Sequence, residues 1–196
     1  MKKTIVRTLT VAGMITTLLF SGASLAELAK KKQTPQGLYL SAIESYDLMQ
    51  KNGKDVLFLD VRTRAEVDFL GMPTVADANI PYLLEGDWAD WDEEKSTFKL
   101  IPNSGFLPAV EQQLAKKGLN KESKIVVMCR SGSRSAKAAK LLGEAGYKNV
   151  YTVVDGFEGD KAKDGAHKGQ RLVNGWKNAN LPWSYKLDRE KMYWEM

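Results

Sequence analysis

The chain has 196 residues, and its 29 lysines and arginines exceed its 24 acidic residues, which gives a formal net charge of +5. This length suits one domain with a proper core. Cys129 is the single cysteine. The sequence therefore excludes an internal disulfide, a dithiol mechanism within the chain and any cysteine-rich metal site.

Residues 1–26 have the order of a secretory signal peptide. A cationic start with Lys2, Lys3 and Arg7 precedes an apolar stretch, and small residues follow up to Ala26. The alternative is an uncleaved anchor, but the stretch falls short of the roughly 20 apolar residues that a span needs. We therefore expect cleavage after Ala26 and a periplasmic or secreted protein with no stable membrane span. Cleavage lowers the net charge to +2, so the sequence pI of about 9.1 is poor evidence for a nucleic-acid partner.

The cleaved chain is expected to start with a linker over residues 27–37. Its three lysines at positions 30–32 are typical of a solvated, flexible leader. One domain is then predicted over residues 38–185, with Trp176 and Leu181 packed on its core. Residues 186–196 form a polar and charged C-terminal extension, which we expect to be loosely held.

Helical and strand patterns alternate through the domain. Helical patterns occupy residues 41–52, 63–67, 107–117 and 135–145. Apolar runs predict buried strands at residues 56–61, 125–128 and 150–154, and a brief extended piece at 79–82. The alternation predicts an α/β fold with a central, mostly parallel sheet flanked by helices. Such sheets bind ligands beyond the carboxyl ends of their strands, where Asp60, Cys129 and Asp155 lie.

Cys129 lies at the junction between a predicted strand and a predicted helix. Free amides and the positive end of the helix dipole favour a thiolate at such a position. Arg130 and Arg134 flank the thiol and favour the anion as well. The pattern indicates a reactive, anion-binding thiol, the alternative being a buried or incidental cysteine.

Three segments, in the right order, resemble the motifs of rhodanese-like domains. Residues 59–66 resemble the Asp-Val-Arg…Glu opening, and residues 129–135 (Cys-Arg-Ser-Gly-Ser-Arg-Ser) resemble the active-site loop. The closing elements are matched by residues 155–157 and by Gly175-Trp176 with Leu181-Pro182. The resemblance covers roughly residues 38–183 and implies the three-layer rhodanese-like fold.

The resemblance implies sulfur transfer through a persulfide on Cys129. This cysteine would accept sulfane sulfur from a small anionic donor such as thiosulfate and pass it to cyanide, a thiol or a protein acceptor. The implied substrate-binding residues are Arg130, Ser131, Gly132, Ser133, Arg134 and Ser135. Asp60 and Arg62 are implied to position the loop but could equally form an ordinary structural pair, and Ser135 could equally cap the helix. No cofactor and no metal are expected.

Three alternatives concern the reaction. Arg134 follows Cys129 after four residues, whereas the related phosphatases and arsenate reductases have five, so the smaller loop fits sulfur better than phosphate or arsenate. A different class is a module that carries or senses sulfane sulfur for a protein partner with little turnover. A cysteine–histidine hydrolase would need His167, the single histidine, but its flanks predict an exposed loop.

The sequence departs from the family in two places. Residues 71–80 stand where the family has a Gly-His-Ile stretch and lack its histidine, which is generally structural. Residues 83–107 look like an enlarged connection, with two tryptophans among acidic residues. This insertion could form a lid or a docking surface for an acceptor protein, or it could simply cover the sheet edge, which is the interpretation that the packing role of tryptophan favours.

Overall fold

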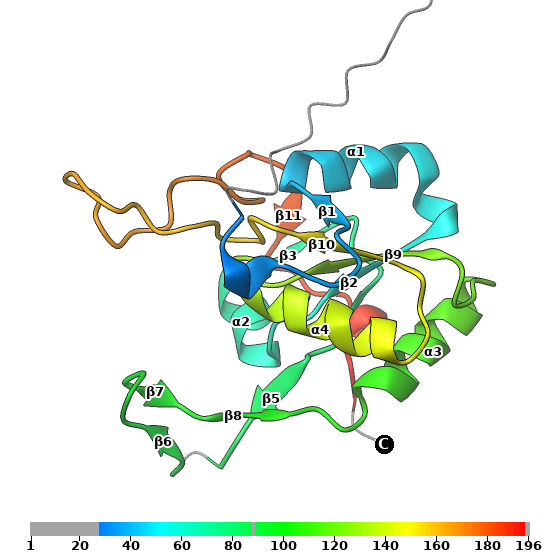
Figure 1. Cartoon of the computed structure of the whole chain (residues 1–196), viewed down its shortest axis with the longest axis horizontal. Helices are drawn as coiled ribbons and strands as arrows, with labels where there is room; N and C mark the ends of the chain where they lie inside the picture. The colour runs from blue at the N-terminus through cyan, green and yellow to red at the C-terminus, as the bar shows by residue number, and fades with distance from the viewer. Residues whose placement is uncertain (1–27, 88, 195–196) are drawn as a thin grey trace, which may run out of the picture.

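The computed structural model describes residues 28–87 and 89–194, so the expected signal peptide lies outside the described residues (Figure 1). The central sheet has the strand order β1-β10-β9-β2-β4, and every neighbouring pair in it is parallel. Its strands are β1 (Tyr39–Leu40), β2 (Val56–Asp60), β4 (Ala78–Asn79), β9 (Lys124–Met128) and β10 (Asn149–Val153). The predicted α/β fold with a parallel sheet is confirmed.

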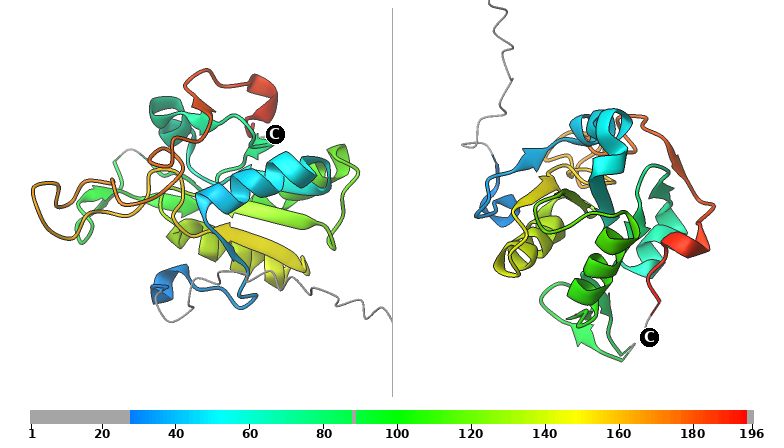
Figure 2. Two further views of the ribbon diagram at one scale, coloured as in Figure 1. Left: turned by 90° about the horizontal axis from the view of Figure 1, so that it is seen from above. Right: turned by 90° about the vertical axis from the view of Figure 1, so that its right-hand side faces the viewer.

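Helices cover both faces of this sheet, which gives three layers (Figure 2). They are α1 (Ala42–Asn52), α2 (Arg64–Leu70), α3 (Phe106–Lys116) and α4 (Ser133–Glu144). Successive side chains of a strand point to opposite faces. Leu57 and Leu59 therefore pack with α3 and α4, whereas Phe58 packs with α1, α2 and Trp176. Both faces need cover, which is why β2 is apolar almost throughout.

The residues at the starts of α1, α2 and α4 explain where the predicted helix bounds were accurate and where the predicted helices were too short. Ser41 and Thr63 each form a capping box with the glutamate three residues later, and these boxes start α1 and α2. Helix α2 continues to Leu70, beyond the predicted turn. Helix α4 starts at Ser133, two residues earlier than predicted, because Gly132 turns the chain with φ +95°. Ser135 therefore lies inside the first turn, and the alternative that it caps the helix is wrong.

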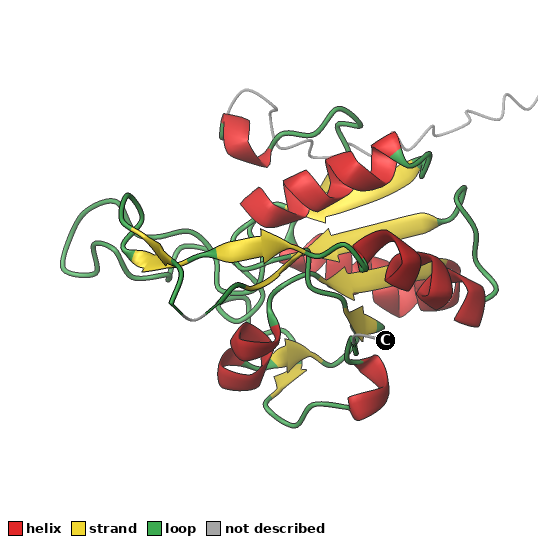
Figure 3. Ribbon diagram, turned by 90° about the horizontal axis from the view of Figure 1, so that it is seen from below, coloured by secondary structure: helices red, strands yellow, loops and turns green. Residues whose placement is uncertain are grey.

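The insertion forms an antiparallel arm that extends away from the central sheet (Figure 3). Strand β5 (Leu83–Glu85) pairs with β8 (Leu100–Pro102), and β6 (Trp91–Asp92) pairs with β7 (Thr97–Phe98). Near the tip, the rings of Trp91 and Phe98 pack edge to face with centroids 5.2 Å apart. The interpretation of this insertion as a cover for the sheet edge is wrong.

The C-terminal segment borders the edge strand β4 instead. Met192, which follows the 3-10 helix η4 (Arg189–Lys191), forms a parallel bridge with Asn79. Lys191 Nζ donates hydrogen bonds to the carbonyl oxygens of Thr74 and Ala76, at 3.1 and 2.9 Å. Further back, β11 (Trp183–Ser184) pairs with β3 (Met72–Pro73). The expectation of a loosely held extension is therefore wrong.

The lysine run near the amino terminus is only partly solvated. Lys30 and Lys31 are exposed, but Lys32 is 6% exposed and its Nζ lies 2.7 Å from a carboxylate oxygen of Asp160. These residues form a short 3-10 helix, η2 (Lys30–Lys32), which packs on α4. The expected packing of Trp176 and Leu181 on the core is confirmed. Within residues 28–87 and 89–194, no helix is long and apolar enough to cross a membrane.

Candidate active site

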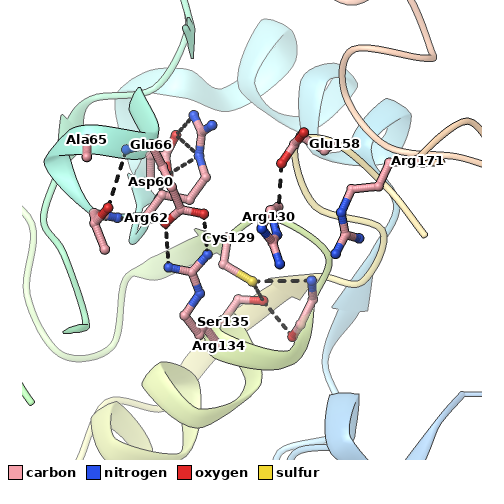
Figure 4. Close-up of polar contacts among 12 residues, drawn as sticks. Asp60, Arg62, Ala65, Glu66, Cys129, Arg130, Arg134, Ser135, Glu158 and Arg171 are labelled. Atoms are coloured by element: carbon pink, nitrogen blue, oxygen red, sulfur yellow. Dashed lines mark hydrogen bonds and ion pairs between the residues drawn. The ribbon is translucent and has the colours of Figure 1, made fainter. Parts of the chain in front are cut away.

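Cys129 lies directly after β9, at the carboxyl end of the sheet and at the floor of a tight loop (Figure 4). The residue is 1% exposed. The backbone N–H of Gly132 donates to Sγ at 3.2 Å, and Ser135 Oγ lies 3.6 Å from Sγ. The Ser135 hydroxyl itself donates to the carbonyl oxygen of Gly132 at 2.8 Å, so the loop and the first turn of α4 are locked together. The sulfur atom thus faces a polar cradle although it adjoins the apolar core.

The loop is held from behind by the segment that follows β10. Phe157 N–H donates to the Cys129 carbonyl at 2.8 Å, and Glu158 N–H donates to the Arg130 carbonyl at 3.0 Å. Gly156 lies between these contacts with φ +66°, and a Cβ there would be 2.6 Å from backbone atoms of Cys129, Arg130 and Ser131. This close approach of two backbones requires glycine, which explains the Asp-Gly-Phe element seen in the sequence.

Arg134 forms an ion pair with Glu66 of α2. Its two terminal nitrogens donate to the two carboxylate oxygens, each at 2.5 Å, and both side chains are less than one-fifth exposed. Burial of Glu66 opposes its ionisation, but the hydrogen bonds and charge of Arg134 outweigh burial and leave the pKa of Glu66 below its usual value. Both terminal nitrogens of the guanidinium therefore bind Glu66, and the pair ties α2 to the cysteine loop.

Arg130, by contrast, faces solvent. Its side chain is 48% exposed, and its Nε lies 3.9 Å from a carboxylate oxygen of Glu158, which is a loose contact. Ser131 and Ser133 are half-buried along the same loop, and Gly132 is buried. All six loop residues predicted from the sequence thus surround Cys129, but the two arginines have different surroundings.

Asp60 and Arg62 form a fully buried pair beside the loop. Arg62 Nη2 lies 2.6 Å from Asp60 Oδ2 and also donates to the Gly71 carbonyl at 2.7 Å. The Arg62 guanidinium lies 3.9 Å from the centroid of the Phe157 ring, and the Phe157 N–H donates to the backbone carbonyl of Cys129. The pair is therefore linked to the cysteine loop through Phe157. This arrangement supports a positioning role.

Asp155, the remaining acid at a strand end, is used by the fold. It is 8% exposed, and its carboxylate accepts the backbone N–H of Ala42 at 2.9 Å, at the start of α1. Burial raises its pKa, partly opposed by backbone hydrogen bonds. His167 is exposed, as expected, and its Nδ1 lies 3.2 Å from Gln170 Oε1.

Arg171 is a residue near the site that the sequence did not indicate. It belongs to the excursion between β10 and Trp176, and Figure 4 shows its guanidinium close to that of Arg130. Its Nη1 donates to the Gly159 carbonyl at 2.5 Å. Its surroundings in the sequence are those of an ordinary charged loop, so no local pattern could have identified it.

Comparison with known proteins agrees with this geometry. The profile described as "Rhodanese-like domain" matches residues 42–163. An uncharacterised protein of Rickettsia conorii is 31% identical over 146 residues, which are 74% of this chain and 96% of that protein. Thiosulfate sulfurtransferase 18 of Arabidopsis thaliana is 34% identical over 100 residues, which are 51% of this chain and 62% of that protein. The crystal structure of Rv0390 from M. tuberculosis superposes with a TM-score of 0.57 at 25% identity, over 76% of this chain and 97% of its own.

These matches define the class of protein. The fold is that of rhodanese-like structures, and the cysteine loop lies where the sheet's carboxyl edge meets a helix start. The chain belongs to the rhodanese-like domain family, a sulfurtransferase-type family.

Proposed function

We propose that this protein is a periplasmic or secreted sulfurtransferase that takes sulfane sulfur from a small anionic donor such as thiosulfate and passes it to cyanide or a thiol. The observation that carries the proposal is the cradle of Cys129. Its sulfur accepts a hydrogen bond from the Gly132 N–H at 3.2 Å and lies at the floor of a loop that leads into helix α4. Such a cradle stabilises an anionic sulfur without a separate base.

The proposed reaction has two displacements. The Cys129 thiolate attacks the outer sulfur of thiosulfate, an S–S bond forms, and the bond between that sulfur and the sulfonate sulfur breaks. Its electron pair leaves with sulfite, and Cys129 is left as a persulfide anion. Cyanide then attacks the outer sulfur of the persulfide, which releases thiocyanate and restores the thiolate. Neither displacement requires an external oxidant or reductant.

The position of Arg134 supports sulfur transfer over phosphate or arsenate chemistry. An arginine that binds an oxyanion in the loop is best left without a carboxylate partner, whereas both terminal nitrogens of Arg134 donate to Glu66, which offsets its charge. The short spacing from Cys129 points the same way, because a smaller loop places a large oxyanion badly for attack.

The test combines turnover with direct observation of the adduct. The wild-type protein is incubated with thiosulfate, and intact and peptide mass spectrometry should show the addition of one sulfur atom on Cys129. With cyanide added, thiocyanate should accumulate over many turnovers. Cys129→Ser should lose both signals, whereas Lys168→Gln, an exposed change outside the site, should keep both. Absence of a sulfur adduct on Cys129 with thiosulfate and with other sulfane donors would overturn the proposal.

A carrier for a protein acceptor is the second candidate, and the arm favours it. Trp91 and Phe98 near its tip are 41% and 59% exposed, which is unusual for large apolar side chains that serve only packing. A carrier would load one sulfur on Cys129 and show little thiocyanate formation. Multiple turnovers with cyanide would exclude this candidate.

A further inference from the structure

Two of the cationic side chains around the cysteine loop are already held by carboxylates. Arg134 is held by both carboxylate oxygens of Glu66, and Lys32 is held by both oxygens of Asp160, at 2.8 and 2.7 Å. A donor anion that approached either side chain would meet a cation whose charge a carboxylate already offsets. The loop therefore needs other cations if it is to attract an anion.

Arg130 and Arg171 are cations of this region that remain accessible. Arg130 is the more exposed, and its contact with Glu158 is loose. Arg171 is half-buried, and the hydrogen bond that its guanidinium makes to the backbone carbonyl of Gly159 does not neutralise its charge. Gly159 in turn donates its N–H to the Arg130 carbonyl at 3.3 Å. The two arginines are thus linked through a single residue, and Figure 4 shows both guanidinium groups beside the cysteine loop.

The backbone fixes Arg171 in this place. Arg171 forms an antiparallel bridge with Lys161, and its carbonyl accepts the side-chain amide of Asn178 at 3.1 Å. The same amide donates to the carbonyls of Glu158 and Asn174, at 3.1 and 2.7 Å. Arg171 therefore stands at the fixed base of the excursion, whereas residues near its tip, such as Lys168, are exposed.

The charges at this place favour an anion. Burial and the positive charge of Arg130 lower the pKa of Arg171, while Glu158, Asp160 and Cys129 act in the opposite direction. Asp160 is already paired with Lys32, and Glu158, which lies 3.9 Å from Arg130, also acts electrostatically on Arg171. One carboxylate offsets only one of the two positive charges, and the remaining positive charge attracts an anion.

We propose that Arg171 and Arg130 together bind the anionic group of the sulfur donor, and that Arg171 makes the site prefer donors with a charged sulfonate-like end over neutral ones. Arg134 then has a positioning role through Glu66. This assignment rests on the proposed function for its physiological meaning. The attraction of an anion to Cys129, however, can be measured without any sulfur transfer.

The experiment compares two alkylating reagents that differ in charge. Iodoacetate and iodoacetamide both react with a thiolate at carbon, and iodoacetate places a carboxylate one atom beyond the atom attacked, as thiosulfate places its sulfonate. The ratio of their rates at Cys129 therefore reports the anion site. Arg171→Gln should lower the iodoacetate-to-iodoacetamide ratio about fivefold at low salt, the effect of roughly 1 kcal/mol from a partly exposed charge pair. Arg171→Lys should keep most of the ratio.

Lys168→Gln is the matched control, because it removes one positive charge from the same excursion at an exposed position. It should leave the ratio unchanged. With thiosulfate, Arg171→Gln should raise KM with little change in kcat, the sign of lost donor binding. In the wild type, the ratio should also fall as salt rises, because exposed charges are screened.

The outcomes separate the two proposals. An unchanged ratio in Arg171→Gln, an equal loss of both rates, or a wild-type ratio that is insensitive to salt would overturn the anion site. If Arg171→Gln does not fold, the wild-type salt series decides the question in its place. A fivefold fall in the ratio, in a protein that forms no Cys129 persulfide, would leave the anion site standing and overturn the sulfurtransferase.

Discussion

Replacing Gly156 by alanine tests the claim that the segment after β10 supports the cysteine loop from behind. A Cβ at this position would lie 2.6 Å from the carbonyl carbon of Arg130, the carbonyl oxygen of Cys129 and the nitrogen of Ser131. The backbones cannot separate freely, because Phe157 and Glu158 donate hydrogen bonds to the loop on either side of the contact. The substitution must therefore break these bonds or displace the loop.

The expected magnitude has two parts. A non-glycine residue at φ +66° costs about 1 kcal/mol or slightly more. Forcing a methyl group into a closed contact adds about 1–3 kcal/mol. Gly156→Ala should therefore lower the free energy of unfolding by about 3 kcal/mol. The displaced loop should also lose most of its sulfur transfer, because small misplacements of reacting groups have large effects on rate.

Gly118→Ala provides a matched control. Gly118 has φ +68°, almost the same backbone conformation, but a Cβ there meets nothing within 4 Å. This variant should lose only the conformational part, about 1 kcal/mol, and keep its activity. Urea unfolding at equal m-value measures both variants. Equal losses of stability in the two variants, with activity retained in Gly156→Ala, would refute the reasoning about the loop.

Two further predictions concern the ion pairs beside the loop. Glu66→Gln should lower the free energy of unfolding by about 1–2 kcal/mol at pH 7, because the pair with Arg134 is largely but not fully buried. The folded pKa of Glu66 is lowered, so the pair's contribution is complete above about 4.5 and is lost as pH falls through the lowered pKa. Stability curves of variant and wild type should converge in acid, and a constant gap between them would contradict this assignment. Asp60→Asn should lose about 3–5 kcal/mol in urea unfolding, because it leaves the fully buried Arg62 uncompensated, and an unchanged midpoint would show that the pair contributes little.

The sequence was sufficient for the parts of the fold that depend on local pattern. Continuous apolar runs located β2, β9 and β10 within a residue or two. Strands that are buried on both faces carry apolar residues at nearly every position, so their bounds can be read directly from the sequence. Helix α1 could be placed because Ser41 caps it, and the strand–loop–helix order fixed the position of Cys129 at the sheet's carboxyl edge. The candidate loop followed from these elements and from the family motifs.

The parts that the sequence could not supply depend on long-range pairing. The arm has strands of two and three residues, too short for a periodic pattern, and its register is set by the partner strand. Lys32 belongs to a run that is typical of a solvated leader, yet Asp160, 128 residues away, captures it. The C-terminal segment is polar and charged in the sequence, but the hydrogen bonds that Lys191 donates to Thr74 and Ala76 hold it against the sheet edge.

The same limitation governs the electrostatics of the cysteine loop. Arg130 and Arg134 are equivalent in the sequence, since both flank the thiol and both add one positive charge. The structure makes them different, because Glu66 neutralises Arg134 whereas Arg130 has a loose contact of 3.9 Å with Glu158. Arg171, which lies 42 positions beyond Cys129 in the chain, then adds its charge beside Arg130. The proposed anion site therefore consists of the arginines that no carboxylate holds closely, and carboxylates on other elements determine which arginines these are.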